Sequence, residues 1–302
     1  MVQSVGTMAL ARIGKCCRSL VREPSKGLFC GVLQPSWIDG CIGGNYIELF
    51  SHKLQRNELI LRDELKLLLH LCQSADDMVI ARDAIYRYHA ENRNLVYGEF
   101  KFGPLFMRLC YELGLEDLAA ATLTDKSMRE FFNEATSFNI ALDMLFTKGS
   151  YEIPILAITD ALEVLRTMRN QGVPFNKETL ILASGICYKL DTAESYRICT
   201  ALIEEGQTKG NLIPRHAYCF AVAFALRRND IIKAQSLYSK IMSTDSRLCQ
   251  NLKVIILARS GAVTDAISIL SAAMVLKSPS FVKKPEFSQE VVSPITHNTD
   301  AT

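Results

Sequence analysis

Residues 136–176 read TSFNIALDMLFTKGSYEIPILAITDALEVLRTMRNQGVPFN, and their pattern predicts two helices joined by a turn. Apolar residues recur at helical spacing over Ser137–Phe146 and again over Ala161–Met168. A glycine follows each run, at Gly149 and at Gly172, where a helix can end because glycine adopts a left-handed backbone at little cost. The stretch therefore predicts a helical hairpin.

The same helical pattern extends over most of the chain, from about residue 57 to residue 276. In one example, Leu65, Leu68, Leu69 and Cys72 fall at i, i+3, i+4 and i+7 and so share one face of a helix. No convincing run of alternating apolar and polar residues interrupts these stripes. The 302 residues include only 16 glycines and 9 prolines, which favours long helices with short links. The sequence therefore predicts an all-α fold.

A small residue recurs near the start of the second helix of each expected hairpin, where two helices must approach closely. These residues lie 32 to 42 positions apart, and they are Ala81, Ala119, Ala161, Ser195, Ala234 and Ala266. A single hairpin cannot bury its apolar face alone, so neighbouring hairpins are expected to stack. The interval therefore predicts an α-α solenoid built from a degenerate repeat.

The N-terminal segment is basic and poor in acids. Before residue 39 it has one acidic residue, Glu23, against five basic residues, Arg12, Lys15, Arg18, Arg22 and Lys26. A cationic amphipathic helix of this kind is typical of a mitochondrial presequence; a disordered basic tail is the alternative. We expect residues 1–40 to form the presequence and a flexible connector that includes the glycines from Gly40 to Gly44. Residues 41–278 then form the helical repeat domain, and residues 279–302 a disordered tail.

Catalytic and metal-binding patterns are missing from the sequence. The five histidines are far apart, and no nucleophile elbow, dinucleotide-binding turn or Walker loop is present. The ten cysteines include no C-x-x-C pair, so buried thiols are expected instead of a zinc site or a disulfide framework. No run of about 18 apolar residues predicts a membrane span. We therefore predict that the chain is not an enzyme and has no cofactor, no metal and no membrane span.

The hairpin of residues 136–176 resembles the pentatricopeptide repeat. Thr136–Asn139 opens it, Lys148-Gly149 closes its first helix, and Gly172–Asn176 ends it, as T-Y-N, K-x-G and G-V-x-P-D do in that family. The resemblance implies a right-handed superhelix that binds single-stranded mitochondrial RNA in the matrix. It also implies a role in mRNA processing that supports the respiratory chain, with other mitochondrial RNA-processing proteins as partners.

The hairpin departs from the family pattern between its two helices. Residues 152–159 add about seven positions to the repeat period, and Pro154 lies within them. Because proline breaks a helix interior, we expect either a bulge between the two helices or the product of an alternative splice at this point.

The family reads a base with the fifth residue of the first helix and the last residue of the repeat, which here are Asn139 and Asn176. Each carboxamide offers donors and an acceptor to a base edge. The alternative is structural: Asn139 satisfies the hairpin locally, and Asn176 caps the following helix. The corresponding fifth residues of the next two repeats are Ile181 and Cys219, so no base-by-base code is expected.

Two further segments are basic, and a second function remains open. Tyr86–Arg93 mixes aromatic residues with arginine, as a base-stacking surface does, but Tyr88 is expected in the core. Arg227-Arg228 is expected to be solvated at a hairpin turn. The formal net charge is only +2, which leaves a helical-repeat scaffold for protein–protein interaction in the mitochondrial matrix as the alternative function. A clustered basic inner face would favour RNA, and a neutral one protein.

Overall fold

A computed structural model describes residues 40–91, 101–148 and 154–275. The expected presequence, apart from Gly40, and the expected tail lie outside the described residues. The chain divides into two compact units, and within the described residues one covers 40–179 and the other 180–275.

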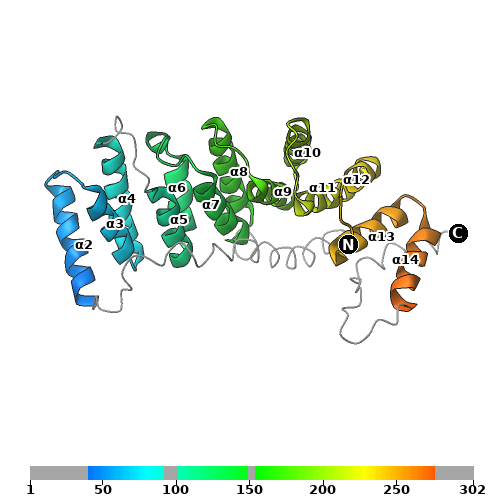
Figure 1. The fold of residues 1–302 in the computed structure, drawn as a ribbon, viewed down its shortest axis with the longest axis horizontal. Helices are drawn as coiled ribbons and strands as arrows, with labels where there is room; N and C mark the ends of the chain where they lie inside the picture. Colours follow the sequence, from blue (N-terminus) through cyan, green and yellow to red (C-terminus); the bar gives the residue numbers. More distant parts are fainter. Residues whose placement is uncertain (1–39, 92–100, 149–153, 276–302) are drawn as a thin grey trace. The chain divides into compact units, whose positions relative to one another are not determined.

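Every regular element of the described residues is helical, as Figure 1 shows. The helices are α2 (Gly40–Gln55), α3 (Arg62–Leu71), α4 (Ala75–Glu91), α5 (Phe102–Leu113), α6 (Glu116–Thr124), η1 (Lys126–Met128), α7 (Ala135–Lys148), α8 (Pro154–Asn170), α9 (Lys177–Leu190), α10 (Ala193–Thr208), α11 (Arg215–Arg227), α12 (Ile231–Tyr238), α13 (Arg247–Arg259) and α14 (Val263–Val275). From α3 onward they pair into hairpins. We call α3, α5, α7, α9, α11 and α13 the first helices, and their partners α4, α6, α8, α10, α12 and α14 the second helices.

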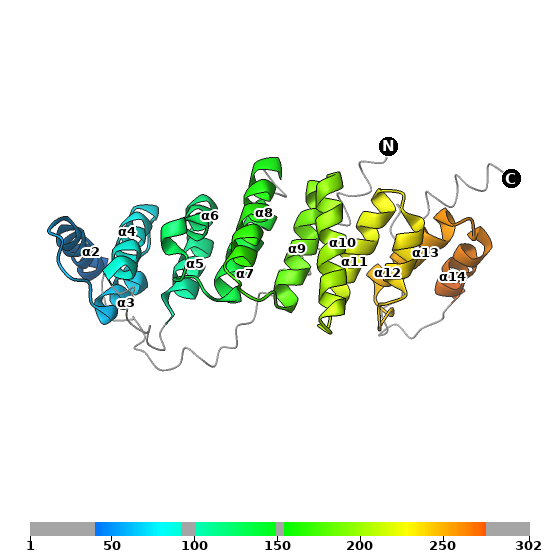
Figure 2. The same ribbon diagram turned by 90° about the horizontal axis from the view of Figure 1, so that it is seen from above.

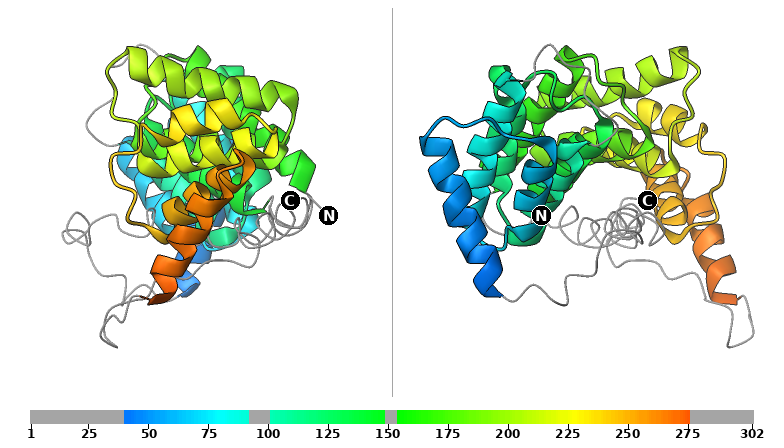
Figure 3. Two further views of the ribbon diagram at one scale, coloured as in Figure 1. Left: turned by 90° about the vertical axis from the view of Figure 1, so that its right-hand side faces the viewer. Right: turned by 60° about the vertical axis from the view of Figure 1, so that its left-hand side comes forward.

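Within each unit, first helices pack on first helices. In the unit of residues 40–179, α3 packs on α5 and α5 on α7, while α6 packs on α8. Figure 2 shows the second helices of this unit along one edge and the first helices along the other. In the other unit, α11 packs on α13, and the α13–α14 hairpin, orange in Figure 3, also contacts α12 through α13. The prediction of an all-α solenoid is confirmed in this arrangement.

The helix ends coincide with residues that favour them. Thr192, Asp230 and Ser246 precede α10, α12 and α13, and each side chain accepts a hydrogen bond from a backbone N–H of the first turn. Gly172, just after α8, has a positive φ of 73°, which a residue with a Cβ rarely adopts. No described helix combines the length and the apolar character that crossing a membrane requires.

The recurring small residue of the second helices is fully buried in every hairpin. Relative exposure is 0% for each of Ala81, Ala119, Ala161, Ser195, Ala234 and Ala266. The sequence interval therefore located a fully buried position in each second helix.

The glycine-rich segment after residue 39 is a helix and not the flexible connector expected from the sequence. The helix α2 includes Gly40, Gly43 and Gly44 and packs on α3 and α4. Its side chains Ile47 and Phe50 are buried. Tertiary packing therefore outweighs the low helix propensity of glycine.

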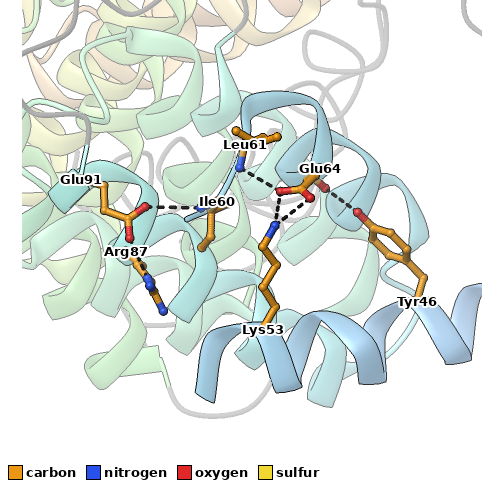
Figure 4. A network of polar contacts seen from close by, with 7 residues as sticks. All are labelled: Tyr46, Lys53, Ile60, Leu61, Glu64, Arg87 and Glu91. Carbon is orange, nitrogen blue, oxygen red and sulfur yellow. Dashed lines mark hydrogen bonds and ion pairs between the residues drawn. The ribbon is translucent and has the colours of Figure 1, made fainter. Parts of the chain in front are cut away.

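A polar network fixes α2 against the first hairpin (Figure 4). Lys53 Nζ donates to both carboxylate oxygens of Glu64, at 2.7 and 2.6 Å, and Glu64 also accepts the Leu61 backbone N–H at the start of α3. On α4, Arg87 pairs with Glu91 at 2.8 Å and also donates to the Leu54 carbonyl oxygen at 3.0 Å. The network therefore links α2 to both helices of the hairpin.

The bulge expected around Pro154 is a wrong prediction. Pro154 is the first residue of α8, so the additional residues from 154 onward lengthen the second helix at its N-terminus. Proline is tolerated there because the first-turn N–H groups have no partner within the helix. Residues 152 and 153 lie outside the described residues.

Arginines tie together the C-terminal ends of first helices in the unit of residues 180–275. Arg227, at the end of α11, donates to the Tyr188 carbonyl oxygen of α9 at 2.9 Å, and its guanidinium lies 3.9 Å from the centre of the Tyr188 ring. One hairpin later, Arg259 donates to the Leu226 carbonyl oxygen. Positive charge is favourable beside the last carbonyls of a helix. These contacts therefore join α9, α11 and α13.

The expectation that Arg227 and Arg228 are solvated is wrong for the same reason. Arg228 Nη2 lies 3.0 Å from Asp191 Oδ1, and the two arginine side chains are only 22% and 32% exposed. Their planar guanidinium groups contact the preceding hairpin instead of extending into solvent.

A larger residue at the buried position should destabilise the fold. We expect Ala119→Leu to lower the free energy of unfolding by about 1–3 kcal/mol, because its added carbons enter a filled site between α6 and its neighbours. Ala121→Leu, two residues along on the exposed face of the same helix, should change it by less than about 0.5 kcal/mol. Urea unfolding followed by circular dichroism measures both; equal losses would contradict the close approach.

Candidate functional site

The structure brings the two predicted site residues together. Asn139 is the fifth residue of α7 and is 5% exposed. Its Nδ2 donates to Asn176 Oδ1 at 3.1 Å and to Glu178 Oε2 at 3.3 Å, while its Oδ1 accepts the Thr179 hydroxyl at 2.7 Å. Both polar atoms of the Asn139 side chain therefore take part in hydrogen bonds at the start of α9.

Asn176 caps α9 and also faces solvent. Its Oδ1 accepts the Thr179 backbone N–H at 2.9 Å, so the capping role predicted as the structural alternative is confirmed. The residue is exposed, and within the described part of the chain its Nδ2 has no hydrogen-bond partner. Two N–H donors are therefore available to a ligand. Contact of Asn139 and Asn176 with RNA stays a prediction.

The fifth residues of the two following first helices are apolar or weakly polar and are buried. Ile181 in α9 is 6% exposed and Cys219 in α11 is 2% exposed. Neither side chain offers a base edge the donor and acceptor that an asparagine does. The site built on Asn139 and Asn176 is thus not copied in the next two repeats.

Charge is divided unequally between the two sets of helices. The first helices carry eleven Lys and Arg against five Asp and Glu, whereas the second helices carry six Lys and Arg against twelve Asp and Glu. The first helices therefore have an excess of six positive charges and the second helices an excess of six negative charges. Because the net charge of the whole chain is only +2, this separation of charge can be recognised only once the helix boundaries are known.

Basic residues at the start of first helices were not singled out in the sequence. Lys177, Arg215 and Arg247 are the first residues of α9, α11 and α13. Acidic residues are the favoured ones at this position, because the N-terminus of a helix carries partial positive charge. Lys177 and Arg215, together with Lys253 in α13, are exposed and form no ion pair with any described residue. The combination of backbone N–H groups and a cation suits an anionic group such as phosphate.

The aromatic and basic stretch that begins at Tyr86 is engaged within the protein. It lines a cavity of about 720 Å³ between α4 and α6. The Tyr86 hydroxyl donates to Asp125 at 2.7 Å, and both burial and this hydrogen bond raise the pKa of Tyr86. Arg82 pairs with Asp83, and Tyr88 is buried as predicted. The lining has two arginines, Arg82 and Arg87, and two aspartates, Asp83 and Asp125, so it has no excess charge of either sign.

Cysteine and histidine side chains give no sign of a metal site. The described cysteines with assigned burial are thiols and are buried, as expected from the sequence: Cys72, Cys110, Cys187, Cys199, Cys219 and Cys249. No three metal-ligating side chains come together in the described ranges. The absence of an enzymatic activity stays a prediction.

Comparison with known proteins gives consistent relatives over most of the chain. Pentatricopeptide repeat-containing protein 2, mitochondrial, from Danio rerio is 55% identical over 246 residues, 82% of this chain and 63% of that protein. The proteins of the same description from Mus musculus and Homo sapiens are 49% and 48% identical, and each match covers 83% of this chain. The chain spans 63–64% of the length of these relatives. No family model matches.

Among solved structures, the crystal structure of the pentatricopeptide repeat protein PPR10 from maize is similar with a TM-score of 0.37 and 16% identity. The similarity covers 97% of this chain and 43% of that chain. A similarity this low carries no argument about the fold.

Removal of the cap at Asn176 should weaken α9. We expect Asn176→Ala to lower the free energy of unfolding by about 1 kcal/mol, because the Thr179 N–H loses its acceptor. Asn176→Asp retains a side-chain oxygen and should retain most of that stability. Thermal and urea unfolding of the two variants test the cap, and an alanine variant as stable as the parent would contradict it.

Proposed function

The chain is a homologue of the mitochondrial pentatricopeptide repeat-containing proteins over the part of them that it spans, and on this premise we propose that it binds single-stranded RNA in the mitochondrial matrix. It acts there in the processing and maturation of mitochondrial mRNA, which supports the respiratory chain. Its partners are RNA precursors and other RNA-processing proteins. It contributes binding and no catalytic step.

The division of charge between first and second helices is the observation that carries the proposal. A chain of net charge +2 would bind a polyanion weakly if its charges were evenly mixed. The excess of six positive charges lies on α9, α11 and α13, because α3, α5 and α7 each carry equal numbers of basic and acidic residues, and these three helices give RNA phosphates a preferred place to bind. Within the unit of residues 180–275, the exposed cations Arg215 and Lys253 then replace counterions along the RNA backbone.

Base contact falls to Asn176, with Asn139 as its positioning residue. The unpartnered Nδ2 of Asn176 presents two donors, which suit the carbonyl acceptors on a pyrimidine edge. Asn139 and Thr179 hold the Asn176 oxygen, so the orientation of the amide is set before RNA arrives. One such site supplies weak base preference, and most of the affinity comes from phosphate contacts.

The scaffold function is the alternative, and the buried fifth residues of α9 and α11 favour it. Ile181 and Cys219 give the next two repeats no base-reading group. If the chain has that function, the first helices would bind a peptide, and their cations would pair with acidic side chains of the partner.

Removal of cations from first helices should lower RNA affinity in a salt-dependent way. We expect Arg215→Gln to weaken binding of a labelled, unstructured RNA by the full chain and to reduce the slope of log K against log salt by about 0.7. Fluorescence anisotropy across a salt series measures both quantities. Arg197→Gln is the matched control, because Arg197 is an exposed arginine of the second helix α10 and forms no ion pair with a described residue. The same loss in both variants would count against the charge division.

Replacement of the Asn176 amide by a carboxylate should distinguish the contribution of base contact to RNA affinity from the contribution of phosphate contact. Asn176→Asp keeps the cap but replaces the two N–H donors with acceptors, so we expect lower affinity for pyrimidine-rich RNA at an unchanged protein stability. The affinity for purine-rich RNA should change less. Competition between labelled pyrimidine-rich and purine-rich RNAs provides the readout. No RNA binding by the unmodified chain under any salt condition would give the scaffold function the lead.

A further inference from the structure

Two buried cysteines face each other between neighbouring first helices of the unit that covers residues 180–275. Cys219 is in α11 and Cys249 in α13, and their sulfur atoms lie 3.7 Å apart. They are 2% and 0% exposed. The helices that carry them pack on each other. The thiols are thus held in contact by the stacking of two hairpins, thirty positions apart in the chain.

The backbone at the start of α13 fixes the position of Cys249. The Ser246 side chain caps the helix by accepting the Cys249 N–H at 3.3 Å. On the other side, the Tyr238 hydroxyl donates to the Cys249 carbonyl oxygen at 3.1 Å. Cys219 lies within a segment of α11, residues 217–222, that is buried throughout. These contacts hold the backbone of Cys249 in place, and the Cys249 thiol itself also lies 3.9 Å from the Ser243 carbonyl oxygen.

The cysteine pair occupies the same place in its repeat as the polar pair of the candidate site. Asn139 and Cys219 are the fifth residues of α7 and α11, and Thr179 and Cys249 are the third residues of α9 and α13. In both cases the residue before the later helix caps the backbone N–H of its third residue. A hydrogen bond of 2.7 Å in one repeat is thus replaced by a contact between two thiols in the other.

We propose that Cys219 and Cys249 form a modification site at which a hydroperoxide introduces a reversible disulfide between α11 and α13. A sulfur–sulfur bond is about 2.05 Å long, so the two sulfur atoms must approach each other by roughly 1.7 Å. The inference concerns these two thiols alone and does not rest on RNA binding.

The chemistry takes two steps and balances without another reagent. The Cys249 thiolate attacks one oxygen of the hydroperoxide and the O–O bond breaks, which leaves a sulfenic acid on Cys249 and releases an alkoxide or hydroxide. The released anion takes up the proton that Cys249 lost on ionisation and departs as an alcohol or water. The Cys219 sulfur then attacks the Cys249 sulfur and the S–O bond breaks. The leaving hydroxide takes the Cys219 proton and departs as water. Two electrons pass from the two thiols to the peroxide.

The surroundings make Cys249 the attacking group. A hydrogen bond from the Cys219 thiol lowers the pKa of Cys249, and the Ser246 side chain and the charge of Arg215 act in the same direction. Burial and the charge of Asp245 oppose this shift without reversing it. Burial raises the pKa of Cys199 to about 12 and raises that of Cys187 as well. The thiolate therefore forms more readily at Cys249 than at those two cysteines. A small uncharged peroxide reaches the buried site during local opening of the stack.

The test treats the full chain in its native state with a small excess of hydrogen peroxide. Remaining thiols are then alkylated, the protein is digested with trypsin without reduction, and the peptides are identified by mass spectrometry. Cleavage after Arg and Lys places Cys219 in residues 216–227 and Cys249 in residues 248–253, with one cysteine in each. We expect a linked pair of these two peptides that disappears on reduction. We also expect the oxidised chain to unfold on the order of 5 °C higher than the reduced chain.

Variants separate this pair from the other buried thiols. Cys219→Ser should remove the linked peptides and leave Cys249 to accumulate as a sulfenic acid, detectable with dimedone. The matched control is the double variant Cys187→Ser/Cys199→Ser, which removes two buried thiols of the same unit and should leave the linked peptides unchanged. The proposal is overturned if native protein gives no linked pair, or if the pair forms only in urea. It is also overturned if Cys187 and Cys199 are oxidised first. The linked peptides and the order in which the thiols are oxidised are measured on the unmodified chain, so these outcomes can be decided even if a variant fails to fold.

Discussion

The close approach of each second helix to its neighbours at one fully buried small residue is the constraint on which the stacks of hairpins depend. A side chain as small as Ala234 or Ser195 lets two backbones pack closely, and the larger apolar residues on either side then fill the remaining space. Because every hairpin meets the same requirement, hairpins of different length can follow one another. The lengthened helix α8 keeps Ala161 buried although it begins at Pro154.

Packing sets the distance between neighbouring helices. Polar contacts at the helix ends set the position of one hairpin along the length of the next. The guanidinium groups of Arg227 and Arg259 bind carbonyl oxygens at the C-terminal ends of the preceding first helices. These oxygens lie in the last turn of their helices and carry partial negative charge, so the contact is favourable. The Leu226 oxygen also accepts the Asn229 backbone N–H at 3.1 Å. Some of the positive charges on the first helices, such as Arg227 and Arg259, are therefore used in contacts between hairpins. Only the exposed cations, such as Lys177, remain available to a ligand.

The sequence was sufficient for the fold class and for the repeat interval, because helical period and small residues are local signals. It was insufficient where tertiary contacts decide. The glycines of α2 predicted a connector, yet burial of Ile47 and Phe50 and the Lys53–Glu64 pair make a helix of that segment. At the candidate site the sequence paired Asn139 with Asn176. It could not show that Thr179 joins them, since Thr179 belongs to the following repeat.

One contact geometry between successive first helices therefore carries different chemistry along the chain. Where the fifth residue of α7 meets the third residue of α9, the Asn139 amide and the Thr179 hydroxyl hydrogen-bond to each other and to the capping oxygen of Asn176. Where the fifth residue of α11 meets the third residue of α13, two thiols meet out of solvent. Each side chain at these positions is small enough for the helices to keep their packing. The backbone arrangement therefore does not fix the chemistry of the side chains that meet at this contact.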